Sequence, residues 1–396
     1  MICLQNRAKF RFLLKGYFVR KTKKYLKKTI FLILAIVMVL TFEAFGASSN
    51  PLDLPSLLTS VKNMDTLSFC GERVPIENQE VLERLEKELL LSLGDRPQVI
   101  LWLKRSRRYL PYIEKMLTEN NMPEDLKYMA IAESALLPHA GSKKGAIGFW
   151  QILSATGRRY GLIIDDTMDE RRNIFASTRA AIAHLKTLYE LLGSWTLSAA
   201  AYNMGEEGLE AEIMVQHTRD YYRLYLPLET QRFIFRILSA KLILSEPDRF
   251  GFYLTDADYY PPLEFDRISI DCFQEIPLSL VAKASKTDFK VIKDLNPEIR
   301  GHYLTEGTHS ILIPKGANNG FNARYKKLVK EYERNRTNRI YIIKEGDNLS
   351  SIADKFDIPL AVLIIWNRLD LNRPIHPGDR LIIYPKSKTV RQDKQD

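Results

Sequence analysis

Apolar residues recur every three or four positions through residues 77–245, and this spacing predicts a mainly helical domain. The clearest helices are expected at 81–93, 99–117, 126–134, 178–191, 196–202 and 231–244. Pro123 and the two acids after it mark the start of the third helix, because Pro and acidic side chains favour the first helical turn. Residues 47–75 are rich in Ser, Pro and Asn and look like a loose lead-in.

After residue 262 the pattern changes to short strands, which are expected at 267–272, 310–314, 339–343 and 380–384. Two short helices are expected between the strands of each pair. Residues 317–338 are polar and basic, which is typical of a linker with some helical character.

The two strand pairs belong to an internal repeat that aligns without a gap at a shift of 71 residues. The identical positions are Leu278/Leu349, Ser279/Ser350, Ala282/Ala353, Val291/Val362, Asn296/Asn367, Gly307/Gly378, Ile311/Ile382, Pro314/Pro385 and Lys315/Lys386. Each unit is expected to run strand, helix, helix, strand. In the second unit Asp347 is expected to cap the first helix; in the first unit Gln274-Glu275-Ile276 replaces the Glu345-Gly346-Asp347 turn.

These patterns predict a multidomain chain. A mainly α domain should occupy 77–260, and small α+β (βααβ) repeats should occupy 266–316 and 339–386, with 317–338 as the linker between them.

The net charge of +10 is concentrated at the N-terminus, where ten Lys and Arg lie between residues 7 and 28 without an acid. From residue 47 onward there are 48 basic and 47 acidic residues, so no basic patch indicates nucleic-acid binding. The basic stretch leads into an apolar run at 30–42, which as a helix would span about 20 Å, less than a ~30 Å bilayer core. Small residues follow at 44–47, so residues 1–46 are expected to be a signal peptide or, if uncleaved, an N-terminal anchor that associates with the membrane through 30–42.

Few residues offer familiar catalytic chemistry. The six His show no metal-ligand spacing, and the chain has no serine-nucleophile, phosphate-loop or dinucleotide motif. Cys3 lies in the leader, and Cys70 and Cys272 are expected to be small apolar core residues. No metal or cofactor is therefore expected.

Glu133 is the candidate acid. It follows Met129-Ala130-Ile131-Ala132 at the C-terminal end of an apolar helix, where burial and the helix dipole both disfavour a negative charge. A raised pKa suits a general acid at neutral pH. Taken alone, the position is more typical of a surface Glu at the end of a buried helix.

Two further segments carry polar groups near small residues. Residues 141–151 hold three Gly, which let the backbone approach a ligand, together with Ser142 and Gln151. Phe149 and Trp150 either stack on sugars or fill the core. Residues 199–205 place Tyr202 and Asn203 after three Ala.

Together, Glu133-Ser134, Gly145-Ala146-x-Gly148-x-x-Gln151 and Ala201-Tyr202-Asn203-x-Gly205 resemble lytic transglycosylases of the soluble and membrane-bound D type. Leu226-Pro227-Leu228-Glu229-Thr230 is similar to a closing motif of the D-type branch, and the resemblance covers roughly 95–245. It implies a lysozyme-like catalytic fold. Residues 339–385 resemble a LysM module, and 266–315 a degenerate one. The chain departs from the pattern at Trp150, where many relatives have Met, and lacks a lipid-anchor Cys after the apolar run.

The resemblance implies cleavage of the bond between N-acetylmuramic acid and N-acetylglucosamine in peptidoglycan. Glu133 would protonate the glycosidic oxygen and then accept a proton from the C6 hydroxyl of the muramic acid, which leaves a 1,6-anhydro end. Two-carboxylate glycosidases hold their acids about 5–9.5 Å apart. Glu124 and Asp125 on the same helix would lie about 12 Å or more from Glu133, so one carboxylate is expected to act alone.

The family motifs also imply substrate-binding residues: Ser142, Gln151, Tyr202, Asn203 and, with a structural helix start as the alternative, Glu229. The LysM resemblance implies glycan contacts from Gly346, Asp347, Asn348 and Pro377. The expected partner is the peptidoglycan strand, and the expected location is the periplasm or cell envelope.

Two other functions stay open from the sequence. Goose-type lysozymes share the helical fold and hydrolyse the same bond; here a loop carboxylate such as Glu206 or Glu207 would activate water. Alternatively, the chain is a wall-binding protein whose catalytic domain is inactive.

Overall fold

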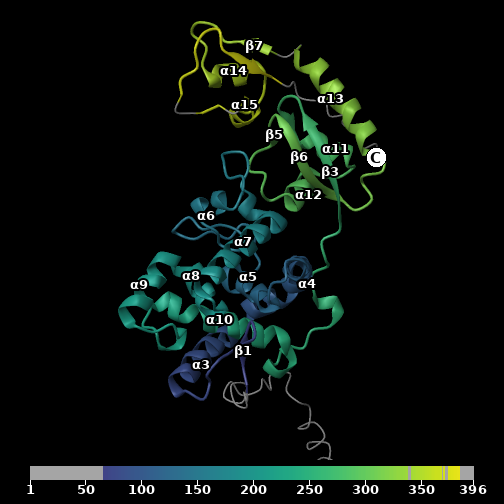
Figure 1. The fold of residues 1–396 in the computed structure, drawn as a ribbon. Coiled ribbons are helices and arrows are strands. Elements are labelled where there is room, and N and C mark those ends of the chain that lie inside the picture. The colour runs from purple at the N-terminus through teal and green to yellow at the C-terminus, as the bar shows by residue number, and fades with distance from the viewer. Residues whose placement is uncertain (1–65, 338–339, 368, 371–372, 384–396) are drawn as a thin grey trace, which may run out of the picture. The chain divides into compact units, whose positions relative to one another are not determined.

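The computed structural model describes residues 66–337, 340–367, 369–370 and 373–383 (Figure 1). The expected signal or anchor segment, residues 1–46, lies outside them. In the described part of the chain, no helix combines the length and the apolar character needed to cross a membrane. Residues 245–253, which include the 3-10 turn η4 (Pro247–Phe250), group apart from the rest of the described chain and are treated by themselves.

Helices build residues 77–244, as the apolar spacing predicts. They are α3 (Gln79–Gly94), α4 (Arg96–Glu119), α5 (Lys127–Ser134), α6 (Ser154–Arg159), α7 (Ile174–Leu192), α8 (Trp195–Met204), α9 (Glu206–Gln216) and α10 (Leu228–Ser245), with the turns η1 (Glu124–Leu126), η2 (Glu170–Arg172) and η3 (Tyr221–Arg223). All six expected helices are present. Helices α6 and α9 were not expected, because α6 has only 6 residues and α9 buries only Leu209 and Ile213.

Helix α5 is almost entirely buried, and its C-terminus is fixed by the backbone. Every residue from 127 to 132 is buried. The helix ends where Ala135 and Leu136 take left-handed φ angles of 53° and 59°. Non-glycine residues in this region cost on the order of 1 kcal/mol each. This abrupt ending puts Glu133 in the last turn of a buried helix.

The loose lead-in expected at 47–75 is wrong for its described part. Strands β1 (Ser68–Phe69) and β2 (Glu72–Arg73) form a hairpin that buries Phe69 completely. The Glu72 carboxylate accepts hydrogen bonds from Ser194 Oγ and Thr196 N, both at 2.9 Å. A carboxylate at a helix N-terminus satisfies free backbone N–H groups, so the hairpin caps α8 and belongs to the domain.

The first repeat has the expected order of strand, helix, helix, strand. After the turn η5 (Asp256–Asp258), it contains β3 (Phe265–Cys272), β4 (Ile276–Pro277), α11 (Leu278–Ala284), α12 (Phe289–Leu295), β5 (Tyr303–Leu304) and β6 (Gly307–Pro314). Strands β3 and β6 pair antiparallel over their whole length, and β4 pairs with β5. Cys272, Ile276 and Val281 contribute to the core of the repeat. Cys272 is therefore a buried apolar residue, as expected.

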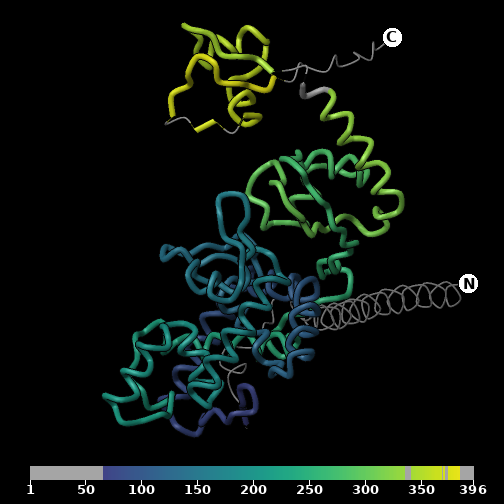
Figure 2. Tube along the Cα trace, turned by 45° about the horizontal axis from the view of Figure 1, so that its top comes forward, coloured from purple at the N-terminus to yellow at the C-terminus, as the bar shows by residue number. Residues whose placement is uncertain are grey.

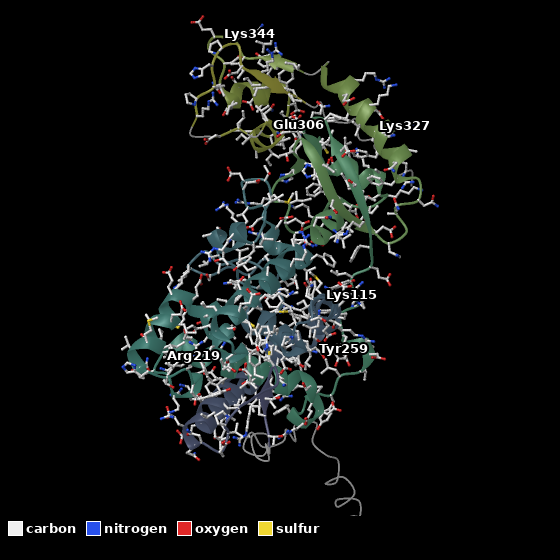
Figure 3. All side chains as sticks on the ribbon, viewed as in Figure 1. Lys115, Arg219, Tyr259, Glu306, Lys327 and Lys344 are labelled. Atoms are coloured by element: carbon white, nitrogen blue, oxygen red, sulfur yellow. The ribbon has the colours of Figure 1, made fainter. Side chains whose placement is uncertain are left out.

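The segment expected to be a linker is largely the helix α13 (Phe321–Thr337). Phe321 and Tyr325 are 0% and 9% exposed and belong to the core of the first repeat. Because aromatic side chains bury large apolar areas, the first turns of α13 are part of the repeat rather than a free connection. Exposed charged residues such as Lys327 cover its outer side (Figure 3).

The second repeat consists of β7 (Ile340–Ile342), α14 (Leu349–Lys355), α15 (Leu360–Asn367) and β8 (Arg380–Ile382). It has its own core, which includes Ile343, Ile352, Leu363 and Leu381. Figure 2 traces the chain from the helices (blue and teal) through the first repeat (green) to this unit (yellow). The remaining parts of the expected strands, Arg339 and Tyr384, lie outside the described residues.

The gap-free alignment of the two repeats is wrong at the last strand. In the first repeat the Asn296 side chain bonds both backbone groups of Leu312; in the second, Asn367 bonds those of Ile382. The Asn and its partner are 16 residues apart in the first repeat and 15 in the second. The connection into the final strand is therefore one residue shorter in the second repeat, and Ile311 corresponds to Leu381 rather than Ile382.

Candidate active site

The side chain of Glu133 is only partly exposed to solvent. Within the described residues, its carboxyl forms no hydrogen bond or ion pair. Burial raises its pKa from 4.5 to about 8; Arg236 opposes this shift, and the negative charge of Glu229 adds to it. At neutral pH the carboxyl is thus mostly protonated, as a general acid requires.

Two hydrogen bonds hold the chain beside Glu133. Ser134 Oγ lies 2.8 Å from the carbonyl oxygen of Phe149. Tyr202 Oη donates to the carbonyl oxygen of Trp150 at 2.8 Å. Burial, with the charge of Glu133 as a second cause, keeps the pKa of Tyr202 well above its usual value. The Tyr202 proton is thus directed to the loop carbonyl, while the oxygen keeps lone pairs that can accept a hydrogen bond.

Residues 141–152 are here named the active-site loop. Their conformation requires the backbone at Gly148 to lie close to the backbone of Arg171. Gly148 has φ +85°, and a Cβ atom there would lie 1.9 Å from the carbonyl oxygen of Arg171. Only glycine fits without displacing that backbone. Gln151 has φ +46°, and its Nε2 donates to the carbonyls of Ala140, which precedes the loop, and Gly148, so both amide hydrogens are used inside the protein.

Ser142 is exposed on the same loop, and its Oγ accepts from the backbone N–H of Ala146 at 3.1 Å. The hydroxyl proton remains available to a ligand. Phe149 and Trp150 are 2% and 0% exposed. Trp150 Nε1 donates to Thr178 Oγ1 at 2.9 Å. Of the two roles open from the sequence, both aromatic side chains fill the core, so Trp150 does not reshape a sugar subsite by direct contact.

Asn203 and Glu229 each have a partner that the sequence reasoning missed. Asn203 Oδ1 accepts from Thr230 Oγ1 at 2.9 Å, which leaves the amide N–H groups as donors. Glu229 Oε1 accepts from Arg236 Nη1 at 2.6 Å. Thr230 adjoins the motif residue Glu229, and Arg236 follows two helical turns later on the same face. That spacing was the available signal for Arg236.

Arg236 also contacts α5, the helix that carries Glu133, directly. Its Nη2 donates to the carbonyl oxygen of Ala132 at 2.6 Å. A cation at the C-terminal carbonyls of a helix is favourable. Arg236 thus ties α10 to the last turn of α5 and places its positive charge beside Glu133.

Three of the other carboxylates considered from the sequence form ion pairs, whereas Glu207 is exposed in the first turn of α9. Glu124 is 2.6 Å from Lys127, and Asp125 is 2.7 Å from Lys241. Glu206 is 3.0 Å from Arg159. Its pKa is lowered by a hydrogen bond from its own backbone N–H and by Arg159.

In the LysM-type unit, two of the expected glycan-binding turns lie together. The Gly378 N–H donates to the carbonyl oxygen of Ile343 at 2.9 Å, which brings the turn at Pro377 next to the start of the Lys344–Asn348 turn. Gly346 has φ +84°, and both it and Asn348 are exposed. The exposed Lys344 is labelled in Figure 3.

The expected cap of α14 is wrong by one residue. Asn348, and not Asp347, is the N-cap: its Oδ1 accepts from Ser351 N at 2.8 Å. Asp347 instead accepts from Lys344 N and Tyr341 Oη, both at 2.8 Å. One donor is a backbone N–H of the turn and the other is the Tyr341 hydroxyl, so the carboxylate closes the turn rather than capping the helix.

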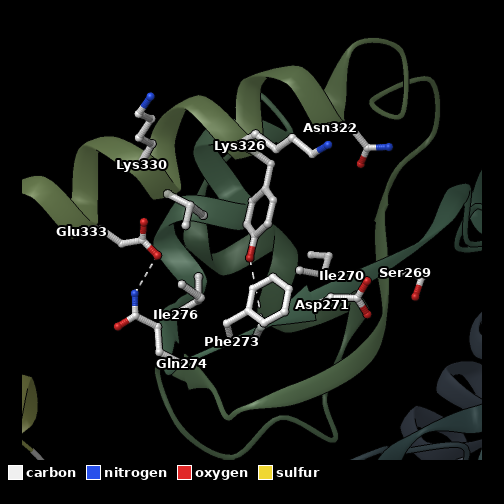
Figure 4. A pocket seen from close by; sticks show the side chains of 13 residues that line it. Ser269, Ile270, Asp271, Phe273, Gln274, Ile276, Asn322, Lys326, Lys330 and Glu333 are labelled. Atoms are coloured by element: carbon white, nitrogen blue, oxygen red, sulfur yellow. Dashed lines mark hydrogen bonds between the residues drawn. The ribbon is translucent and has the colours of Figure 1, made fainter.

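A groove of about 730 Å³ lies in the first repeat, away from Glu133. Its walls are the end of β3, the turn after it and α13 (Figure 4). Phe273, 90% exposed, lines it, and Gln274 Nε2 donates to Glu333 Oε1 at 2.9 Å. Gln274, which begins the segment that replaces the Glu345-Gly346-Asp347 turn of the second repeat, is therefore bonded to α13.

Comparison with known proteins identifies two domains. A family model described as "Transglycosylase SLT domain" matches residues 111–224, and one described as "LysM domain" matches 341–383. The first match contains Glu133, the active-site loop and the Tyr202–Asn203 pair.

Two curated relatives match most of the chain. They are named "Membrane-bound lytic murein transglycosylase D", from Escherichia coli strains K12 and O6:H1, and each is 29% identical over 344 residues, 83% of this chain and 74% of the relative. Among solved structures, the 70 kDa soluble lytic transglycosylase of Escherichia coli matches at 15% identity over 44% of this chain and 32% of that one. Its TM-score of 0.32 is too low to carry an argument.

Proposed function

We propose that this chain, which contains an SLT transglycosylase domain and a LysM domain, is a lytic transglycosylase in which Glu133 alone supplies the acid and base for cleaving peptidoglycan. The observation that carries the proposal is a carboxyl without a partner among the described residues, whose pKa is raised to about 8. The bond cut is the one between N-acetylmuramic acid and N-acetylglucosamine.

The reaction balances with one carboxyl. Protonated Glu133 donates its proton to the glycosidic oxygen as the bond from C1 to that oxygen breaks. The C6 hydroxyl of the same muramic acid then attacks C1, and its proton passes to the Glu133 carboxylate. The product is a 1,6-anhydro ring, and Glu133 ends in its starting protonation state, so no water is consumed.

The ion pairs of the other acids favour this route over hydrolysis. A hydrolytic enzyme needs a second carboxylate to activate water or to act as nucleophile. Glu206 is paired with Arg159, and Glu229 with Arg236. An ion-paired carboxylate is a weaker base, because the neighbouring cation stabilises its charge.

The remaining polar groups suit an amide- and hydroxyl-rich sugar. We assign the Ser142 hydroxyl and the Asn203 amide as donors, and the Gln151 side-chain oxygen as an acceptor. Tyr202 Oη accepts from protonated Glu133 or faces the oxocarbenium-like transition state. We assign Glu229 an indirect role, through its ion pair with Arg236.

We further propose that the LysM-type unit retains the enzyme on the wall through Gly346, Asp347, Asn348 and Pro377. These residues lie on two turns joined by the bond from Gly378 to Ile343. Export to the cell envelope follows from the substrate and from the basic and apolar N-terminus.

The experiment is mass analysis of muropeptides released from purified peptidoglycan. The wild-type chain should release anhydro ends, and Glu133→Gln should lower the rate by roughly 10²–10⁴-fold, because general acid–base catalysis contributes about that factor. The variant should still be pulled down by peptidoglycan.

Glu190→Gln serves as the matched control, since Glu190 is exposed on α7 and the variant should leave the rate unchanged. Products uniformly one water heavier than the anhydro forms would overturn the transglycosylase mechanism. If Glu133→Gln cleared walls at the wild-type rate, Glu133 would not be the acid and base of the reaction.

A further inference from the structure

A buried ion pair between Arg171 and Asp169 supports the active-site loop. Arg171 and Asp169 are 5% and 2% exposed. Arg171 Nε and Nη2 donate to the two carboxylate oxygens of Asp169 at 2.8 and 2.9 Å. Arg171 Nη1 donates to the carbonyl oxygens of Gly145 and Ile152 at 2.9 and 3.2 Å. Four of the five N–H groups of this buried guanidinium are thus used inside the protein, so it holds structure rather than substrate.

The two carbonyls lie on opposite arms of the active-site loop. Bridges join Gly141 to Ile147 and Ile147 to Ile152, so the loop folds back on itself. The backbone of Arg171 also fills the space that a side chain at position 148 would need. One residue therefore fixes both arms of the loop that carries Ser142 and leads to Gln151.

The backbone segment that carries Asp169 is hydrogen-bonded to the first repeat. The Asp169 N–H donates to the carbonyl oxygen of Glu298 at 2.8 Å, and the Arg300 N–H to that of Thr167 at 2.8 Å. Met168 bridges Ile299, which is 1% exposed, and packs against the core of the repeat. The repeat thus adds a strand-like segment to the loop that carries Asp169.

We propose that Asp169 and Arg171 are positioning residues for the reaction of Glu133, and that the first repeat acts as a brace that keeps them in place. This inference rests on the proposed function. A degenerate repeat without its glycan-binding turn then contributes to turnover at the catalytic site. Arginine is required because its planar fork can bind one carboxylate with two nitrogens while a third reaches two carbonyls; a lysine has a single nitrogen.

The test combines kinetics with a direct measure of loop order. Lys143 and Lys144 are exposed on the loop, so the rate of tryptic cleavage after them in the native protein reports how often it opens. Arg171→Lys keeps the charge and should speed this cleavage. It should also lower kcat/KM on soluble glycan strands by about 10–100-fold, since an active site misplaced by an ångström costs about that much.

Met168→Asp tests the brace without altering the ion pair. A carboxylate against the core of the repeat is costly, so the 165–169 segment should detach. The same two effects are expected, while the melting temperature stays near that of the wild type. Matched controls are Arg158→Lys, whose exposed guanidinium donates to the Ile164 carbonyl oxygen, and Met214→Asp at a residue 71% exposed.

Loss of activity by Arg171→Lys with unchanged cleavage at the loop would overturn the positioning role. Wild-type behaviour of Met168→Asp in both assays would overturn the brace. If the wild-type chain released no anhydro ends, the proposed function would fail, and the cleavage assay would still decide whether the brace orders the loop.

Discussion

At the scale of single residues, the chemistry depends on how poorly Glu133 is solvated. The carboxyl has lost much of its contact with water and, among the described residues, has gained no hydrogen-bond donor. Arg236 offsets part of this cost, but it is shared with Glu229 and with the Ala132 carbonyl. Burial therefore outweighs the attraction of the nearest cation, and the pKa rises to about 8.

The raised pKa predicts a pH profile. Glu133 must be protonated to act as an acid, so kcat/KM should fall as the pH rises through about 8. Steady-state rates on soluble glycan strands between pH 5 and pH 10 would show this limb. A profile that stays level to pH 10 would contradict the raised pKa.

The same shift predicts a pH-dependent stability. The folded chain keeps a proton on Glu133 that the unfolded chain releases above about 4.5, so wild-type stability should decrease between that value and about 8. Glu133→Gln has no charge to bury. A pKa shift from 4.5 to about 8 corresponds to at most about 5 kcal/mol, so the Tm of this variant should exceed that of the wild type by up to about 10–20 °C at pH 9, and by less at pH 5.

The comparison is made by thermal unfolding at both pH values. A constant difference in Tm between the two chains would show that Glu133 has an ordinary pKa. Glu207→Gln, at an exposed position, should show no such trend.

At the scale of elements, the active-site loop is built around one glycine. A Cβ atom at position 148 would overlap the Arg171 carbonyl, and φ is +85°. Gly148→Ala should therefore lower the free energy of unfolding by about 2–4 kcal/mol, from strain and from displacement of the backbone, and reduce activity with it.

Gly145→Ala is the matched comparison, because Gly145 has φ +83° but open space around its Cβ. It should cost only about 1 kcal/mol. Urea denaturation of the two variants separates the cost of the left-handed φ angle from the cost of the overlap with the Arg171 backbone. Equal losses would mean that the close approach to Arg171 does not constrain the loop.

Other elements owe their ends to contacts far along the chain. Helix α8 begins where Glu72, some 120 residues earlier in sequence, caps it. Helix α5 ends at two left-handed residues, and Arg105 donates to the Ala135 carbonyl at 3.1 Å. Local sequence predicts that these helices exist, whereas their ends depend on tertiary partners.

At the scale of the whole molecule, we assign catalysis to the helical domain and retention on the cell wall to the LysM-type unit. The LysM-type unit has its own buried cluster, including Ile343, Ile352 and Leu381. Deleting 339–386 should therefore leave turnover of short soluble strands near the wild-type value. Retention on intact peptidoglycan should drop by about tenfold or more, because a second tethered binding site raises overall avidity.

Sedimentation with purified walls and turnover of short strands measure the two properties separately. Glu133→Gln should show the opposite phenotype, with binding kept and turnover lost. Equal loss of retention and turnover in the deletion variant would argue against a separate binding unit.

The sequence by itself determined the helical domain, the two repeats and the family, because these depend on periodicity and on short motifs around Glu133, Gln151 and Tyr202. It also indicated a raised pKa for Glu133, since an apolar helix end implies burial. It left open whether Trp150 stacks on sugars or fills the core, and the structure shows that it fills the core. It placed the cap of α14 one residue too early, at Asp347 instead of Asn348.

Only the tertiary structure decided which groups remain available at the site. The Thr230 hydroxyl donates to the side-chain oxygen of Asn203, and the Tyr202 hydroxyl donates to the backbone carbonyl of Trp150. Arg236 donates to the Glu229 carboxylate. A hydrogen bond depends on distances of a few tenths of an ångström between segments that no sequence spacing relates. Likewise, the contacts of the first repeat with residues 165–169 became visible only once the folded chain brought Glu298 to Asp169.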